Sequence, residues 1–180
     1  MAAVPAPTER LVIRNWVDDD AVAFAEMNGD PRVMATIGPV MDRSESDAML
    51  RRVRRHIADH GFGLWCVDLD GEVIGFCGLS IPWFTEGVEI GWRLRSAFWG
   101  NGFATEAARS VLGHGFDVLG LTEVISFTAE TNVRSRRVME RIGLIRDPRG
   151  DFDHPGIPEH NPLRPHVLYR IDVERYRCCL

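Results

Sequence analysis

One stretch of the chain decides its fold: Val88 to Gly115, which reads VEIGWRLRSAFWGNGFATEAARSVLGHG. Its first part alternates at the strand period of two, and one face carries the apolar side chains Val88, Ile90, Trp92 and Leu94. The other face carries Gly87, Glu89, Gly91 and Arg93, which leaves open space around a carboxylate. Farther on, small and apolar residues recur at helical spacing: Ala104, Ala107, Ala108, Val111, Leu112 and Gly115. The stretch therefore predicts a strand, a loop rich in glycine, and a helix.

The glycines of Gly100-Asn101-Gly102 stand where the predicted strand gives way to the helix. A helix N-terminus has unpaired amides and a partial positive charge, and glycines let a phosphate approach the backbone closely. The pattern therefore favours a site that holds a pyrophosphate without a lysine. An ordinary flexible turn is the alternative, because Gly-x-Gly by itself occurs in many unrelated sequences.

Other phosphate-binding loops fit this sequence less well. There is no Gly-Lys-Ser/Thr for a nucleotide triphosphatase, and Ala104-Thr105 stands where the last glycine of a dinucleotide fingerprint would be sought. Glu123 opens the next predicted strand, whereas an acid that binds a ribose should close it.

Strands and helices follow one another along the rest of the chain. Strand patterns cover residues 11–14, 64–69, 72–79, 123–128 and 167–171, and helical patterns cover 18–27 and 44–60. Asp70-Gly71 predicts a tight type I′ hairpin, because both positions need positive φ. Ser44 with Asp47 resembles a capping pair for the second helix. The predicted fold class is α/β or α+β around a mixed sheet.

The composition is that of one ordinary globular domain. The chain has 180 residues, of which 45% are hydrophobic and 26% charged, and it is long enough to bury about 70% of its unfolded surface. The formal net charge of -5 argues against nucleic acid as a partner, and no run is long enough to span a membrane. Residues 1–9 are expected to form a flexible lead, and the four cysteines are too few for a disulfide scaffold. We therefore expect a cytoplasmic protein with reduced thiols.

Two motifs resemble those of the GNAT superfamily of N-acetyltransferases. Trp99-Gly100-Asn101-Gly102-Phe103-Ala104 is similar to the family's Gln/Arg-x-x-Gly-x-Gly/Ala loop, except that Trp99 replaces Gln or Arg. The wider run Phe98 to Glu106 is similar to the RimJ/RimL type, the N-terminal acetyltransferases of ribosomal proteins. Asn132 to Leu144 resembles the family's Asn-x-x-Ser and Glu-Lys/Arg-x-Gly-Phe/Leu segment. The resemblance spans about residues 11–144 of what we expect to be a single domain, residues 1–180.

The resemblance implies a fold, a cofactor and a reaction. The fold would be a mixed, mostly antiparallel twisted sheet flanked by helices, with a splayed strand pair that holds acetyl-coenzyme A (acetyl-CoA). The reaction would be direct transfer of acetyl to a primary amine. The resemblance leaves open whether the protein forms a homodimer. The implied cofactor-binding residues are Trp92, Leu94, Trp99, Gly100, Asn101, Gly102, Phe103, Ala104, Thr105, Asn132 and Ser135. Asn132 also suits the N-cap of a helix.

Glu89 and Ser135 are the candidate catalytic residues. Glu89 would act as the base, directly or through water, because the amine must be neutral to attack and an apolar wall can raise the pKa of a carboxylate. The alternative is an ordinary solvent-facing strand residue. Ser135 shares a helix face with Met139 and Ile142, so its hydroxyl should point inward unless it bonds to its own helix. Many family members have at the position of Met139 a tyrosine that protonates the departing thiolate, so here Ser135 or water would have to serve.

The class of acceptor stays open. An α-amino group of pKa about 8 costs roughly 1.4 kcal/mol to deprotonate at pH 7, against roughly 4.6 kcal/mol for a lysine, so a modest base favours a peptide N-terminus. A small-molecule amine, such as an aminoglycoside or polyamine, is the rival. A non-catalytic acyl-CoA-binding regulatory module is a third alternative, which Trp99 and Met139 suggest.

The irregular stretch 147–165, with its five prolines, is expected to border the acceptor site. Its acids, Asp151, Asp153 and Glu159, would attract a cationic amine. His154, His160 and His166 match no common spacing of metal ligands, so no metal is expected. Cys66 and Cys77 are expected in the core, and a solvated helix face is expected for Arg51, Arg52, Arg54 and Arg55.

Overall fold

Eight strands and six α-helices make up the fold in the computed structural model, which describes residues 3–179. The strands are β1 Val12–Arg14, β2 Leu64–Leu69, β3 Glu72–Ser80, β4 Glu89–Leu94, β5 Glu123–Ala129, β6 Ile145–Arg146, β7 Phe152–Asp153 and β8 Pro165–Asp172. The helices are α1 Ala21–Gly29, α2 Pro31–Met34, α3 Arg43–His60, α4 Phe103–Gly113, α5 Val133–Arg141 and α6 Val173–Cys179. Short 3-10 turns cover Asp18–Asp20, Ser96–Phe98 and Pro148–Gly150, and a π-helical turn covers His114–Val118.

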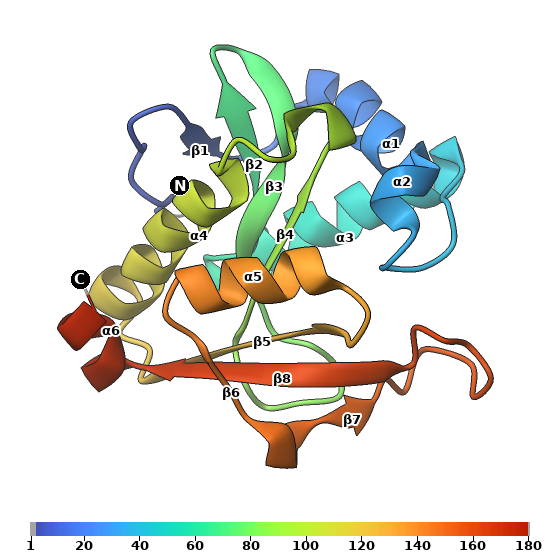
Figure 1. Ribbon diagram of the computed structural model, residues 1–180. Coiled ribbons are helices and arrows are strands. Elements are labelled where there is room, and N and C mark those ends of the chain that lie inside the picture. The colour runs from blue at the N-terminus through green and yellow to red at the C-terminus, as the bar shows by residue number, and fades with distance from the viewer. Residues whose placement is uncertain (1–2, 180) are drawn as a thin grey trace.

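All of these strands belong to one sheet, in the order β1-β2-β3-β4-β5-β8-β6, with β7 also paired to β8 (Figure 1). Within residues 3–179 every pairing is antiparallel except that of β4 with β5, which is parallel. The prediction of a mixed, mostly antiparallel sheet flanked by helices is confirmed. The hairpin between β2 and β3 is also confirmed, since Asp70 and Gly71 have φ of 52° and 88°.

The parallel pair β4–β5 separates almost as soon as it forms. Its single register pair is Glu89 with Ile125, and the amide of Ile125 donates to the carbonyl of Val88 at 2.9 Å. One step farther, the Ser126 hydroxyl donates to the Ile90 carbonyl at 2.8 Å. Beyond this point no ladder bond joins the two strands in the described part of the chain. The strands therefore form a V with its vertex at Glu89 and Ile125.

Helices cover both faces of the sheet. In Figure 1, α4 and α5 lie in front of the sheet, and the start of the turn after α4 packs against Leu79 and Val124. On the opposite face, the side chain of Asn28 in α1 accepts a hydrogen bond from Arg93 of β4 at 2.6 Å. The front face of β4 therefore carries Ile90 and Leu94, and its back face carries Glu89, Gly91 and Arg93, as the alternation predicted.

The N-terminus of α3 differs from the prediction. Its N-cap is Asp42, which accepts from the Glu45 amide at 2.8 Å, while Glu45 accepts from the Asp42 amide at 2.8 Å. The expected pair Ser44–Asp47 does not cap the helix, because both residues already lie inside its first turns. Leu50, Val53 and Ile57 form the buried stripe of this helix.

Three other segments differ in detail. The predicted helix 18–27 is a 3-10 turn followed by α1. The stretch 147–165 is not structureless, because it contains a 3-10 turn and β7, and the closing strand begins at Pro165. Of the expected flexible lead, Met1 and Ala2 lie outside the described residues. The rest lies against α4, where Ser110 donates to the Ala6 carbonyl at 2.6 Å and Thr8 donates to Glu106.

The cap of α3 gives a stability test. Asp42→Ala removes the side chain that accepts from the Glu45 amide and so breaks the pair of reciprocal bonds between Asp42 and Glu45. The free energy of unfolding should therefore fall by about 1 kcal/mol. Ser44→Ala is the matched control and should cost less, because Ser44 donates only to the Asp42 carboxylate. Urea denaturation measures both, and an equal or larger loss for the control would contradict this assignment of the cap.

Candidate functional site

Glu89 lies at the vertex of the V, where β4 and β5 part. Its carboxylate accepts a hydrogen bond from the Ser80 hydroxyl at 3.3 Å. The residue as a whole is partly buried, and loss of solvent around the carboxyl group raises its pKa to about 8, against a smaller lowering by Ser80. A carboxyl group with this pKa can both accept and return a proton near neutral pH.

The loop between β4 and α4 presents unpaired amides. Gly100 and Gly102 have φ of 83° and 81°, a conformation that favours glycine, and Gly102 is the N-cap of α4. No side chain caps this helix, whereas Asp30, Asp42 and Asn132 cap α2, α3 and α5. The Asn101 side chain instead donates to the carbonyls of Phe98 and Trp99, at 3.3 and 3.2 Å. The first turn of α4 is therefore open to an anion.

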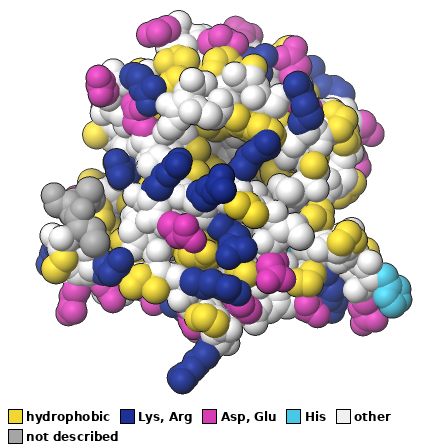
Figure 2. Space-filling view, in the orientation of Figure 1, with side chains coloured by type: hydrophobic (Ala, Val, Ile, Leu, Met, Phe, Trp, Pro, Cys, Tyr) yellow, Lys and Arg dark blue, Asp and Glu magenta, His cyan; other side chains and the backbone are white. Residues whose placement is uncertain are grey.

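Basic side chains surround this loop. A groove of about 550 Å³ lies beside the first turn of α4, and three arginines line it, Arg10, Arg109 and Arg141. Glu9 and Glu106 also line it, and Glu106 pairs with Arg10. The guanidinium of Arg134, at the start of α5, lies 4.3 Å from the centre of the Trp99 ring, while the indole nitrogen of Trp99 donates to the Leu94 carbonyl at 3.0 Å. The chain has 21 arginines and no lysine, and Figure 2 shows several of the arginines in a row across the middle of the face on which α5 lies.

The start of α5 closes the other side of the V. Asn132 is its N-cap, with Oδ1 accepting from the Ser135 amide at 3.3 Å and Nδ2 donating to Thr128 of β5 at 2.9 Å. Ser135 is partly buried, and its hydroxyl makes no hydrogen bond to the described residues, so the alternative of a bond to its own helix is not seen. Met139 is buried, at 1% exposure.

Neither tyrosine of the chain replaces the phenol missing at Met139. Tyr169 is buried beneath α5, donates to Glu140 at 3.1 Å and accepts from Arg136 at 3.4 Å. Tyr176 stacks on Phe116 and donates to Asp117 at 3.1 Å. Both hydroxyls are thus committed to structural contacts.

The stretch 147–165 packs against the back of β5 and β8 through a cluster of aromatic rings. The cluster consists of Phe84, Phe127, Phe152, His154 and His166, with neighbouring ring centres 4.9 to 6.3 Å apart. Phe127 lies two residues beyond Ile125 on β5, and therefore on the face that carries Glu89. The cluster thus borders the β5 side of the V.

The acids of this stretch are less available than the sequence suggested. Asp151 pairs with Arg146 and accepts from the Leu168 amide at 3.1 Å, and Asp153 pairs with Arg164 at 3.3 Å. Of the three acids expected to attract an amine, only Glu159 has no ion pair within the described residues. Arginines from the same part of the chain neutralise the other two.

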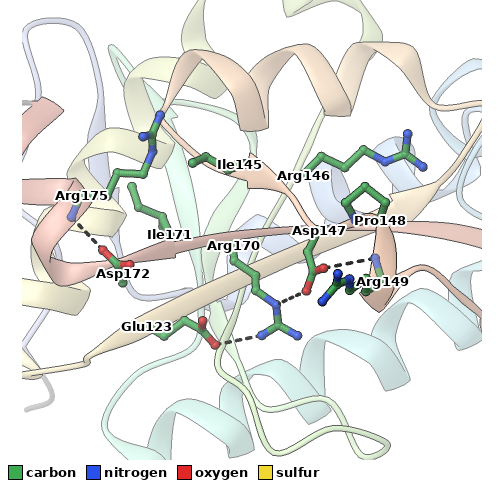
Figure 3. A pocket seen from close by; sticks show the side chains of 10 residues that line it. All are labelled: Glu123, Ile145, Arg146, Asp147, Pro148, Arg149, Arg170, Ile171, Asp172 and Arg175. Atoms are coloured by element: carbon green, nitrogen blue, oxygen red, sulfur yellow. Dashed lines mark hydrogen bonds and ion pairs between the residues drawn. The ribbon is translucent and has the colours of Figure 1, made fainter.

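A second cavity lies at the edge of the sheet, between β6 and β8, and has a volume of about 400 Å³ (Figure 3). Three of its charged side chains are paired with one another, since Arg170 donates to Asp147 and Glu123 at 2.8 and 2.9 Å. Glu89 is not among its lining residues. The cavity is therefore separate from the vertex of the V.

The remaining candidates of the sequence analysis lie elsewhere. Residues 3–179 contain no group of three His, Cys, Asp or Glu side chains placed to hold a metal ion, and none of their helices is long and apolar enough to cross a membrane. Cys66 and Cys77 are fully buried, and burial raises the pKa of both thiols. On α3, Arg51, Arg52 and Arg55 are exposed as predicted, while Arg54 bonds Asp18 at 2.7 Å.

Comparison with known proteins identifies the family. The acetyltransferase (GNAT) domain matches residues 10–145. The chain belongs to the GNAT family of acetyltransferases. It is therefore an acetyl-CoA-dependent acyltransferase, as the two motifs predicted. The matched residues include β4, β5 and the glycine loop between β4 and α4, but they end before the stretch 147–165 and β8.

Two relatives and one solved structure illustrate the range of this GNAT enzyme's similarities. It is 32% identical over 143 residues to the uncharacterized protein YkkB of Bacillus subtilis, covering 76% of this chain and 83% of that protein. It is 37% identical over 111 residues to FsC-acetyl coenzyme A-N(2)-transacetylase of Aspergillus fumigatus, covering 55% of this chain and 47% of that one. RimJ of Mycobacterium smegmatis, solved in complex with CoA-disulfide, superposes with a TM-score of 0.78 at 20% identity, covering 96% of this chain and 88% of RimJ. At this identity, the likeness to RimJ shows the fold alone.

Some residues around the site could not be found from the sequence. Arg10 precedes β1, Arg109 lies in α4 and Arg141 in α5, and no sequence spacing links the three. The contact of Arg134 with Trp99 likewise joins α5 to a loop more than 30 positions earlier. These side chains come together only in the folded structure, where α5 lies beside α4.

The raised pKa of Glu89 predicts a dependence of stability on pH. Because the folded-state pKa of about 8 lies above the ordinary 4.5, the folded protein holds more protons between these pH values, and its free energy of unfolding falls as pH rises through them. Glu89→Gln removes this loss, so the variant should gain more than about 1 kcal/mol relative to wild type between pH 5 and pH 9. Urea denaturation at both pH values tests this. Glu86→Gln, at an exposed residue nearby, should show no such gain. If the stability of Glu89→Gln relative to wild type is likewise independent of pH, the carboxyl group of Glu89 has an ordinary pKa.

Proposed function

We propose that this GNAT enzyme acetylates the α-amine of a peptide N-terminus, with Glu89 as its general base. The observation that supports this most is the position and pKa of Glu89, which lies at the vertex of the V with a pKa of about 8. This value is close to the ordinary pKa of an α-amine, so the proton can pass from amine to carboxylate with little cost. Glu89 takes the proton directly or through one water molecule.

The cofactor-binding role is assigned to the open side of the V and the glycine loop. The first-turn amides of α4, at Phe103, Ala104 and Thr105, would hold the pyrophosphate, and the arginine-lined groove would receive the remaining phosphate charge. The pantetheine arm would run along the backbone of Trp92 to Leu94, which lacks a ladder partner on β5. Asn132 would border it from α5. Trp99, Gly100, Asn101 and Gly102 would shape the loop.

The reaction needs one proton acceptor and one proton donor. The neutral amine nitrogen forms a bond to the thioester carbonyl carbon, the carbon–sulfur bond breaks, and the amine's proton goes to Glu89. The thiolate then takes a proton from water, either directly or relayed through the Ser135 hydroxyl, and Glu89 returns its own proton to solvent. A thiol of pKa about 8.5 leaves without a strong acid, so the absence of a tyrosine at Met139 is tolerable.

A small-molecule amine is the second candidate acceptor. The relative from Aspergillus fumigatus bears a name that assigns it an N(2)-transacetylase reaction, which keeps this class open. The motif Phe98 to Glu106 favours the RimJ/RimL branch and hence a peptide. Thiol release with matched panels of peptides, aminoglycosides and polyamines, followed by mass spectrometry of the products, would decide between the two classes.

We further propose that residues 1–180 act as one acetyltransferase domain in which the stretch 147–165 forms a wall of the acceptor site. The aromatic cluster carries this assignment, since it joins the stretch to the face of β5 that bears Ile125 beside Glu89. The wall is then mainly aromatic, because Asp151 and Asp153 are paired with arginines.

Substitution of the N-cap glycine tests the cofactor site. Gly102→Val forces a branched residue into φ of 81°, and either its side chain or the relaxed backbone should disturb the phosphate-binding amides. Affinity for coenzyme A, measured by calorimetry, should fall at least about tenfold. Gly61→Val is the matched control, because Gly61 has φ of 77° at the far end of α3 and suffers the same strain away from the site. Equal affinities of the two variants would remove the loop from the cofactor site.

Substitution of the proposed base tests the chemistry. Glu89→Gln keeps the shape but cannot accept a proton, so turnover at pH 7 should fall about 100-fold and recover in part as the pH approaches the pKa of the amine. The pH dependence of kcat/KM measures this, with Glu86→Gln as the control. A variant with the wild-type profile would make Glu89 a structural residue.

A further inference from the structure

Arg93 shares the back face of β4 with Glu89 and has no acidic partner. None of the ion pairs within residues 3–179 includes Arg93. By contrast, Arg95, two residues farther on, pairs with Glu26 at 3.2 Å and Glu72 at 2.9 Å. The Nε atom of Arg93 is buried and makes no hydrogen bond.

The guanidinium of Arg93 is held in place by neutral groups. Its Nη1 donates to the side-chain oxygen of Asn28 at 2.6 Å, and it lies 5.3 Å from the centre of the Phe76 ring. Asn28 is itself fully buried and donates to the Ser46 hydroxyl at 2.9 Å, so its oxygen is directed to Arg93. These contacts orient the charge without neutralising it, and loss of solvent lowers the pKa of Arg93 to about 10.

The floor between Glu89 and Arg93 is open. Gly91 lies between them on the same face, and a Cβ placed there would meet only Glu89 Oε1, at 3.8 Å, within 4 Å. The Cα atoms of Glu89 and Arg93 are four residue steps apart along the strand, which corresponds to about 13 Å. A substrate that lies over Gly91 can therefore place its amine at Glu89 and a second group, several bonds away, at Arg93.

We propose that Arg93 binds a carboxylate of the acceptor, so that the enzyme selects amines that carry an acidic group several bonds from the reacting nitrogen. This proposal rests on the function proposed above. A desolvated guanidinium with unused donors favours a carboxylate, which it can bind through two parallel hydrogen bonds. An acidic side chain next to a peptide N-terminus has the required separation. The carboxylate of a free α-amino acid lies only two bonds from its amine and fits the distance less well.

The test uses equilibrium binding to the protein saturated with coenzyme A. The probes are two hexapeptides with a free N-terminal alanine, Ala-Glu-Gly-Gly-Gly-Gly and Ala-Gln-Gly-Gly-Gly-Gly, together with free glutamate and its diamide. Wild type should bind the Glu peptide about tenfold or more tightly than the Gln peptide. Arg93→Met should abolish this preference, and Arg93→Lys should keep part of it. Arg95→Met, which removes a neighbouring arginine of the same charge, should leave the preference unchanged.

The outcomes separate this inference from the proposed function. Calorimetry with coenzyme A alone shows whether Arg93→Met is folded, and Arg93→Lys serves if it is not. Equal binding of the two peptides by wild type, or a preference that survives in Arg93→Met, overturns the role of Arg93. If acetylation of both peptides continues in that case, the proposed function stands. A preference confined to free glutamate, lost in Arg93→Met, keeps the carboxylate site but overturns the peptide as its source.

Discussion

The parting of β4 and β5 is the constraint on which the rest of the site depends. Two neighbouring strands of one sheet would normally satisfy each other's backbone groups, but here the ladder ends at the bond from the Ile125 amide to the Val88 carbonyl. Past it, only the Ser126 hydroxyl reaches across, to the Ile90 carbonyl. From that point the backbone of each strand needs another partner, because buried amides and carbonyls are costly when unpaired. A long, thin ligand with amide groups, such as the pantetheine arm of coenzyme A, can supply such partners. The fold therefore has a gap in its sheet, and this gap is the cofactor site proposed above.

Local sequence signals predicted the parts of this arrangement that local physics controls. The hairpin at Asp70-Gly71, the alternation along β4 and the glycine loop each depend on residues close together in the chain, and all appear in the structure. The start of α3 was misplaced because Asp42 and Ser44 are both good capping residues, and only the backbone decides between them. The contact of Arg134 with Trp99 had no local signal, because it forms only once α5 lies beside the loop.

The stretch 147–165 shows why charge read from sequence can mislead. Its acids were expected to attract a cationic substrate, but charged residues from the same part of the chain pair with them once β7 and β8 align. What the stretch contributes near the site is apolar surface, through Phe152 and its neighbours in the aromatic cluster. Sequence reasoning placed the stretch near the acceptor side for its length and prolines, but the physical character of that surface depends on which side chains are left over after pairing.

The two charged residues on the back of β4 belong to one electrostatic problem. Partial burial moves the pKa of Glu89 up to about 8 and that of Arg93 down to about 10, since both charged forms lose water. Side by side, the two would neutralise each other and lose both effects. Gly91 keeps them apart and leaves the space between them free of side chains. The separation preserves a carboxyl group that can take a proton at neutral pH and a guanidinium that still lacks an anion. A substrate with an amine at one end and a carboxylate at the other satisfies both.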